Sequence, residues 1–142
     1  MRNLLQTTAI FLVVTLAIQV FPVTRDNPPV AGAVAAPPPV AATLRRACFN
    51  CHSNETVWPW YSRVAPTSWF VANDVHQGRE HLNFSTWMSL TPAEQQKRLR
   101  KIADVVEKGA MPPGIYTPFH QEARLSLEDI TTVAEWARAS AK

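Results

Sequence analysis

Cysteine is scarce in this chain and confined to one place. The 142 residues include two cysteines, Cys48 and Cys51, and both lie in one short stretch. With no other cysteine available, the chain cannot form the several disulfides that hold together many small secreted domains. Any role of these two thiols is therefore limited to a single segment.

Long runs of one charge are absent as well. The chain has 14 basic and 11 acidic residues and a formal net charge of +3. These charges are spread along the sequence, without a Lys/Arg stripe or a recognition motif of the kind that binds DNA or RNA. The composition therefore argues against a nucleic-acid partner.

No stretch alternates apolar and polar residues in the way that predicts a half-buried strand. Helix signals are clear instead, with capping boxes at residues 91–94 and 126–129 that precede apolar residues at helical spacing. Prolines interrupt residues 53–66 and 110–121, which we expect to be loops. We predict an all-α domain over residues 42–142, with long loops and no internal repeat.

Shorter patterns predict two further helices. Residues 41–47 can form a short helix that leads into the cysteines. Thr67 is a plausible cap for a helix over residues 68–79, with Gly78 near its end.

The first residues form a long apolar run. Residues 4–23 are apolar apart from two Gln and a few Thr, and about twenty such residues span the hydrocarbon core of a bilayer as a helix. A cleaved signal peptide is the alternative, but no small-x-small cleavage site lies near the end of the run, and residues 33–36 lie far past it. Because the run has no polar face, a buried core helix is a poor interpretation. We predict an uncleaved signal anchor, one transmembrane helix, over residues 1–24.

A linker rich in proline and alanine follows, over residues 25–41. Five prolines lie between residues 27 and 42. Such a composition favours an extended, polyproline-type conformation. We expect this segment to hold the following domain away from the lipid surface.

The two cysteines belong to the motif Cys48-Phe49-Asn50-Cys51-His52. Two thiols three positions apart on a helical turn can reach the two vinyl groups of one porphyrin. The adjacent His52 then supplies an imidazole nitrogen to the iron. The motif predicts one covalently bound haem c, attached through Cys48 and Cys51 with His52 as first axial ligand.

Three other interpretations of the motif remain open. A thioredoxin-like redox pair would need a βαβ context, which the sequence does not offer. A zinc site could use His76 and His81, although the spacer that separates Cys51 from His76 is much longer than in a zinc finger. A plain disulfide between Cys48 and Cys51 is the third.

Met111 is the best candidate for the second axial ligand. It follows a helix and a glycine and precedes two prolines, which restrict the backbone around its thioether. Ligation by Met and His would raise the reduction potential. Alternatively Met111 only fills a gap in the core, as Met often does, and one of His76, His81 and His120 is the ligand.

Aromatic residues are numerous for so short a chain and can pack on a flat cofactor or simply form the core. The candidates are Trp58, Trp60, Tyr61, Trp69 and Trp87. Arg63 and Arg79 could pair with haem propionates, although a solvated surface charge is the simpler interpretation of both.

The chain resembles a bacterial haem-binding domain family of small c-type cytochromes. The resemblance covers most of the chain and lies in Cys48-Phe49-Asn50-Cys51-His52-Ser53-Asn54-Glu55-Thr56, Trp58-Pro59-Trp60-Tyr61-Ser62, Ala65-Pro66, Ser68-Trp69, Asp74-Val75, Gly78-Arg79, Leu82-Asn83-Phe84-Ser85, Trp87, Met111-Pro112-Pro113, Tyr116, His120 and Leu125-Ser126. The residues around the end of the apolar run, 19–22 and 25–29, are similar too. The resemblance implies haem binding in the cell envelope through Cys48, Cys51, His52 and Met111. It implies no defined reaction.

These observations favour a membrane-anchored c-type cytochrome with a cytochrome c-like helical haem domain, which exchanges single electrons with redox protein partners. Haem c is attached on the outer face of the bacterial inner membrane, so the domain should face the periplasm or cell exterior. A haem-based enzyme or sensor, with one axial position open to peroxide or a gas, is the alternative. A third interpretation is a structural module in which the haem serves as core.

Overall fold

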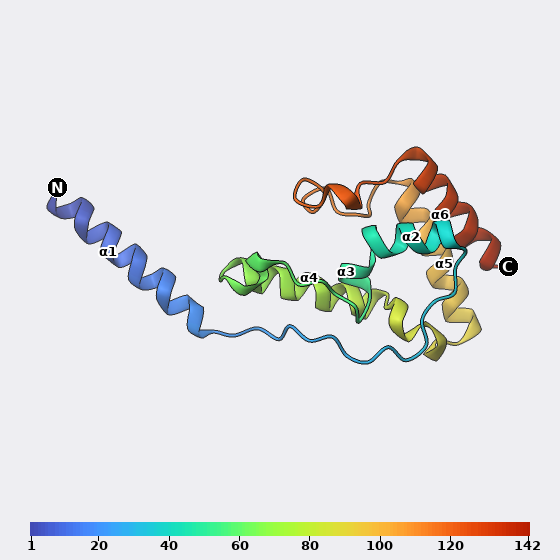
Figure 1. Ribbon diagram of the computed structural model, residues 1–142, viewed down its shortest axis with the longest axis horizontal. Helices are drawn as coiled ribbons and strands as arrows, with labels where there is room; N and C mark the ends of the chain where they lie inside the picture. The colour runs from blue at the N-terminus through green and yellow to red at the C-terminus, as the bar shows by residue number, and fades with distance from the viewer.

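Every regular element of the chain is helical, and no strand is present. The computed structural model describes all 142 residues (Figure 1). The predicted all-α fold is therefore confirmed. In chain order the elements are α1 (Arg2–Ala17), η1 (Ile18–Val20), α2 (Pro38–Ala47), α3 (Phe49–His52), η2 (Trp60–Arg63), α4 (Thr67–His81), η3 (Phe84–Ser89), α5 (Pro92–Glu107), η4 (Gln121–Ala123) and α6 (Leu127–Ser140).

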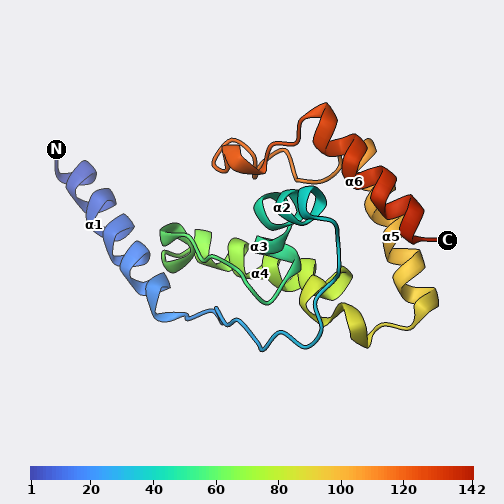
Figure 2. The ribbon, with the colours of Figure 1, turned by 45° about the vertical axis from the view of Figure 1, so that its right-hand side comes forward.

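The N-terminal helix stands apart from the other helices (Figures 1 and 2). Together α1 and η1 form one apolar helix, Arg2–Val20, with a mean hydropathy of 1.7 and no buried residue. A helix of this length and composition can cross a membrane, and a signal sequence near the N-terminus has the same properties. The structure thus contains the single apolar N-terminal helix that the sequence predicted.

Both predicted capping boxes form. In α5 the Thr91 hydroxyl accepts from the Glu94 N–H, and the Glu94 carboxylate accepts from the Thr91 N–H. Ser126 and Asp129 make the same reciprocal pair at the start of α6. Each box satisfies backbone N–H groups that the first helical turn leaves without partners.

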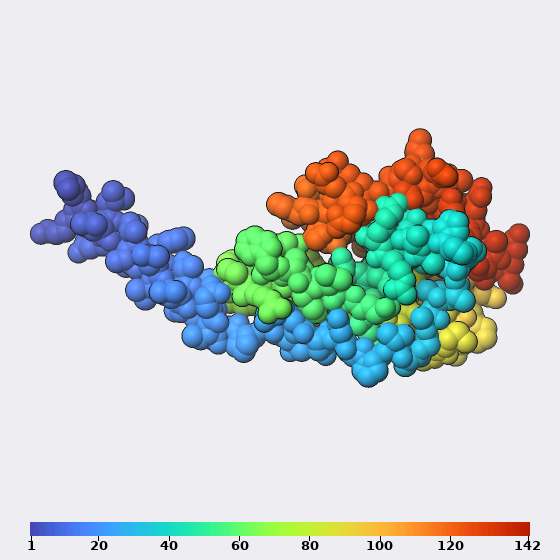
Figure 3. Space-filling model, in the orientation of Figure 1, coloured from blue at the N-terminus to red at the C-terminus, as the bar shows by residue number.

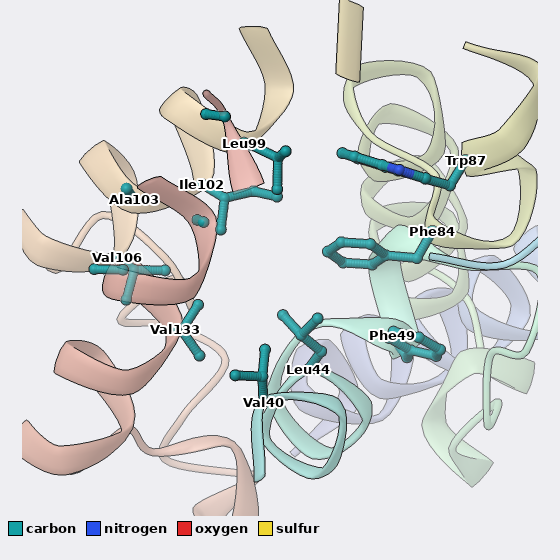
Figure 4. Close-up of a cluster of buried hydrophobic side chains, with 13 residues drawn as sticks. Val40, Leu44, Phe49, Phe84, Trp87, Leu99, Ile102, Ala103, Val106 and Val133 are labelled. Atoms are coloured by element: carbon teal, nitrogen blue, oxygen red, sulfur yellow. The ribbon is translucent and has the colours of Figure 1, made fainter. Parts of the chain in front are cut away.

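The hydrophobic core lies where α2, α5 and α6 meet η3 and the short helix α3 (Figure 4). Leu44 of α2 and Val133 of α6 are almost fully buried there. Trp87 also lies in this core, stacked near Phe84. The structure therefore supports the interpretation in which Trp87 forms part of the hydrophobic core. The thirteen buried residues of the cluster are Val40, Leu44, Phe49, Phe84, Trp87, Leu99, Ile102, Ala103, Val106, Val133, Ala134, Ala137 and Ala141.

The segment that joins α1 to α2 lies along the domain as an extended strap, residues 21–36 (Figure 3). Three backbone hydrogen bonds join it to η3, among them the one that Ala31 N–H donates to the Ser85 carbonyl (2.9 Å). Gly32 adopts a φ of +103°, and a side chain there would collide with η3. The segment is extended, as predicted, but it packs along the domain instead of projecting from it as a spacer.

The first helix of the domain also begins earlier than predicted. α2 starts at Pro38, so residues 38–40 are helical although the predicted helix began at residue 41. Pro38 and Pro39 occupy the first helical turn, where a missing N–H costs nothing because that turn has no intrahelical acceptor for it. Prolines at this point therefore start a helix.

Candidate haem-binding site

The motif lies at a break between two helices. α2 ends at Cys48, whose dihedral angles (φ −125°, ψ −37°) interrupt the helix, and α3 is the single turn that follows. The N–H groups of Cys51 and His52 both donate to the Cys48 carbonyl, at 3.2 and 2.9 Å. The buried ring of Phe49 anchors this turn by stacking on Phe84, with 5.3 Å between ring centroids. Two thiols and an imidazole are thereby held on one turn.

The His52 ring is oriented by the C-terminal part of α4. Its Nδ1 lies 2.8 Å from the Gly78 carbonyl oxygen and 3.1 Å from that of Leu82. Both partners accept hydrogen bonds, so Nδ1 carries the proton and Nε2 keeps its lone pair. Burial lowers the pKa of His52, which favours the neutral ring. A neutral imidazole with a hydrogen-bonded Nδ1–H is the form that ligates metals through Nε2.

Gly78 is a site residue whose role the sequence prediction missed. It lies in the last turn of α4, near the helix end as predicted, and a Cβ built on it would lie 2.4 Å from the Cys51 carbonyl oxygen. Glycine alone permits α4 to approach the motif so closely. A glycine within a helical pattern was the available signal, since such a residue often marks close backbone approach.

Both cysteines are free thiols. Burial raises the pKa of Cys48 to about 12 and that of Cys51 to about 11. The two thiols are therefore protonated at neutral pH, and no disulfide joins them in this structure. Two free thiols beside an imidazole with a bare Nε2 match the donor set of a covalently bound haem.

A cavity of about 60 Å³ opens beside Cys51. α3 forms its floor, η2 and α4 form one wall, and the loop between α5 and α6 forms the other. Tyr61 and His120 meet across it, with the Tyr61 hydroxyl 2.5 Å from His120 Nε2. Cofactor pockets commonly measure about 300 to 1,000 Å³, so a haem at Cys51 requires this contact to open.

Polar and aromatic contacts tie the second wall to the motif. The Asn50 amide donates to the Tyr116 hydroxyl (3.0 Å), and the Tyr116 ring stacks on His120 with centroids 4.0 Å apart. His120 Nδ1 lies 3.1 Å from a Glu122 carboxylate oxygen. Tyr61, His120 and Glu122 thus form one hydrogen-bonded chain at the cavity. The sequence offered His120 only as an alternative ligand and assigned Tyr116 no role.

Met111 lies at the start of the same loop. Its N–H donates to the Val105 carbonyl at the end of α5 (3.3 Å), and the residue is 38% exposed. Its side chain lines neither the cavity beside Cys51 nor the larger one described next. Ligation by Met111 stays a prediction.

The four aromatic candidates other than Trp87 do not line a common cavity. Tyr61 lines the cavity beside Cys51. Trp58 and Trp69 line a different cavity of about 610 Å³ that separates α4 from the strap, and the Trp58 indole N–H is buried without a hydrogen-bond partner. Trp60 lines neither cavity and is 77% exposed.

Arg79 holds the strap and the motif loop. Its guanidinium donates to the carbonyl oxygens of Ser53 (2.8 Å) and Asp26 (3.0 Å) and to the Thr56 hydroxyl (3.0 Å). Arg79 is therefore not a solvated surface charge, and its pairing with a haem propionate stays a prediction. Arg63, by contrast, is exposed at the end of η2.

The competing interpretations of the motif find little support in the fold. No strand is present to supply the βαβ context of a thioredoxin-like pair. The structure contains no group of three or more His, Cys, Asp and Glu side chains that could hold a metal ion such as zinc. His76 is instead exposed on α4, where it pairs with Glu80 one turn away.

The helical fold and the motif together define a haem-binding protein. The comparison with protein families agrees, because the model of the haem-binding domain family matches residues 13–139. The chain belongs to this family. Neither the comparison with curated proteins nor that with solved structures found a match.

Proposed function

We propose that the protein is a membrane-anchored c-type cytochrome that binds one haem covalently and transfers single electrons in the bacterial envelope. The observation that carries the proposal is the geometry of the His52 ring and the two thiols in the motif. His52 presents a bare Nε2 beside two free thiols on the same turn, and two backbone carbonyls fix its orientation. This arrangement suits a ligand to haem iron better than any other use of the three side chains.

Each residue of the motif has a distinct task in this proposal. Cys48 and Cys51 hold the porphyrin through thioether bonds, and His52 Nε2 ligates the iron. When bound, the haem supplies a one-electron couple. The hydrogen bond from His52 Nδ1–H to Gly78 fixes the ring and raises the basicity of Nε2.

The second axial ligand comes from the loop between α5 and α6 in this proposal. We retain Met111 as that ligand, because a thioether opposite an imidazole is the pair that electron-carrying cytochromes use. His120 is the alternative within the same loop, and it lines the cavity together with Cys51. A protein ligand on both faces of the iron would leave no position for a substrate.

The apolar helix Arg2–Val20 serves as the anchor in this proposal. Its length matches the hydrocarbon core of a bilayer. Covalent haem attachment takes place outside the bacterial inner membrane, so the domain lies on the periplasmic or outer side. Redox proteins that reach this side are the proposed electron partners.

A haem-based enzyme or sensor is the second candidate function. The favouring observation is that Met111 is more than a third exposed and lines neither of the two cavities described above. Tyr61, His120 and Glu122, by contrast, place a hydrogen-bonded chain beside Cys51. Such a chain can donate hydrogen bonds to a small ligand on an open iron position. Ready binding of carbon monoxide by the unmodified ferrous protein would favour this candidate over electron transfer.

The covalent attachment is tested by the double variant Cys48→Ser/Cys51→Ser, expressed together with a haem maturation system. We expect haem to stay with the wild-type chain on a denaturing gel and to be lost from the variant. Ser89→Ala, a change at an exposed position of η3, is the control and should keep its haem. Covalent haem in the double variant would disprove the attachment.

A further inference from the structure

The end of the apolar helix is hydrogen-bonded directly to the domain. Gln19, in the last turn of that helix, donates from its amide to the Ala65 carbonyl (3.1 Å) and accepts from the Ala65 N–H (2.9 Å). The Trp69 indole N–H donates to the Phe21 carbonyl just beyond the helix (3.4 Å). The connection from η2 to α4 therefore lies level with the point at which the helix ends.

Two groups of exposed apolar side chains lie at this end of the domain. We call them the two lips, because they flank the cavity beside Cys51. Figures 1 and 2 both show η2 and the loop between α5 and α6 on the side of the domain that faces α1, and Figure 3 shows them as two separate protrusions. The first lip consists of Trp60, Val64 and Phe70, and the second of Ile115 and Phe119.

Four of these five side chains are large and mostly exposed, and Val64 is 45% exposed. Trp60, Phe70, Ile115 and Phe119 are between 67% and 82% exposed. Apolar side chains of this size, gathered at one end of a domain, mark a surface that another body covers.

Charge is nearly absent from both lips. Residues 56–73 contain one charged side chain, Arg63, and residues 109–121 contain none. Arg25 adds a second positive charge beside the first lip, since its guanidinium donates to the Ser62 carbonyl (3.0 Å). Acidic side chains begin just outside these ranges, with Asp74 on α4 and Glu122, whose carboxylate lies 3.1 Å from His120 Nδ1. Exposed aromatic side chains with few charged neighbours are typical of surfaces that enter the headgroup layer of a membrane.

We propose that both lips rest in the headgroup layer of the membrane that α1 crosses, so that the cavity beside Cys51 opens toward lipid. The proposal rests on the proposed membrane anchor. A helix of 19 residues is about 28 Å long, close to the thickness of the hydrocarbon core. Gln19 then lies at the boundary of that core, and Ala65, which it binds, lies there as well. Lipid is therefore the occupant that the position of the lips favours over a second copy of the chain or another protein.

The proposal can be tested with the full haem-loaded chain in vesicles of phosphatidylethanolamine and phosphatidylglycerol. The photoreactive residue p-benzoylphenylalanine replaces Phe70 or Phe119 in the lips, and the lipid adduct is measured by mass spectrometry after illumination. Met88 is the matched control, because it is 67% exposed but lies on η3, at the end of the domain away from α1. Leu12, within α1, reports the anchor itself.

We expect lipid adducts at Leu12, Phe70 and Phe119, several-fold more abundant than at Met88. Adducts at Leu12 without adducts at either lip would overturn the docking and leave the anchor intact. Loss of adducts at Leu12 would disprove the anchor, and the docking with it. Cross-links from Phe70 or Phe119 to a second copy of the chain, in place of lipid, would identify the lips as a protein interface and would likewise refute the proposal.

Discussion

The backbone of α4 at Gly78 lies directly against the Cys51 carbonyl, and this contact sets the position of α4 relative to the motif. A Cβ on Gly78 would lie 2.4 Å from the Cys51 carbonyl oxygen, which is closer than real Cβ atoms approach. The carbonyl of the same Gly78 accepts the Nδ1–H of His52 at 2.8 Å. One glycine therefore provides both the room for α4 and the hydrogen bond that orients the His52 imidazole.

Replacing Gly78 by alanine should separate α4 from the motif. Alanine normally stabilises the interior of a helix by about 1 kcal/mol relative to glycine. In Gly78→Ala the overlap with a backbone oxygen should outweigh that gain and lower the free energy of unfolding by about 1 to 3 kcal/mol. Urea unfolding measures the loss, and the yield of covalent haem on a denaturing gel should fall with it.

Gly114→Ala is the matched control for that experiment. A Cβ at Gly114 meets no atom within 4 Å, so stability and haem yield should stay near those of the wild type. If Gly78→Ala proved as stable as Gly114→Ala, the close approach of α4 to Cys51 would be wrong.

The second axial ligand can be assigned by spectroscopy. Met111→Ala should remove the near-infrared band that arises from sulfur-to-iron charge transfer, and it should lower the reduction potential because the thioether is lost. Met88→Ala removes a different exposed methionine and should leave both quantities unchanged. Absorption spectra of the oxidised protein and a redox titration provide the two measurements.

The same spectra test His120, the alternative candidate for the second axial ligand. An unchanged spectrum in Met111→Ala would eliminate Met111 as ligand. If His120→Ala then converted the iron to a form that binds carbon monoxide readily, the ligand would be His120, whose ring already lines the cavity with Cys51.

The parts of this molecule that sequence predicts well are those set by neighbours along the chain. A capping box joins residues three positions apart, so Thr91 with Glu94 and Ser126 with Asp129 could be predicted from spacing alone. The motif is equally local, because one turn carries Cys48, Cys51 and His52. Local hydrogen bonds of this kind depend little on the rest of the fold.

The strap and the role of Gly78 depend on contacts that are distant in the sequence. Arg79 reaches Asp26 across more than fifty positions, and no periodicity marks a segment whose backbone is hydrogen-bonded to η3. Prolines indicate an extended conformation but not what lies beside it. For the same reason the sequence could rank Met111 above His120 as a ligand without locating either side chain.

Arg79 offers a test of the strap. Arg79→Lys keeps the positive charge but loses the forked guanidinium that binds Ser53, Asp26 and Thr56 at once. Hydrogen bonds to charged groups contribute about 1.5 to 3 kcal/mol each, so the strap should open roughly tenfold more often or more. Trypsin should then cleave after Arg25 correspondingly faster, as followed by mass spectrometry.

Arg63→Lys is the control for the strap experiment, because Arg63 is exposed at the end of η2. Its cleavage rate after Arg25 should equal that of the wild type. Equal rates in Arg79→Lys and Arg63→Lys would show that Arg79 does not hold the strap.

Asp129 should make the stability of the domain depend on pH. Its carboxylate lies 2.5 Å from the Arg46 guanidinium and accepts from the Thr43 hydroxyl (3.0 Å), which joins α6 to α2. The Arg46 guanidinium, followed by the hydrogen bonds from Ser126 and Thr43, holds the pKa of Asp129 well below its usual range. A lowered pKa in the folded state stabilises the fold above the unfolded pKa of about 3.9, and the stabilisation is lost as the pH falls toward the folded value.

Asp129→Asn should therefore lower the free energy of unfolding by about 1 to 2 kcal/mol at pH 7. The difference from the wild type should shrink as the pH drops below about 4, because the wild-type carboxylate is then progressively protonated. Thermal unfolding at a series of pH values measures this difference. Glu128→Gln, the neighbouring exposed carboxylate, should show a much smaller effect at pH 7. A difference between Asp129→Asn and the wild type that stayed constant from pH 7 to pH 2 would mean that the ionised carboxylate does not stabilise the contact of α6 with α2.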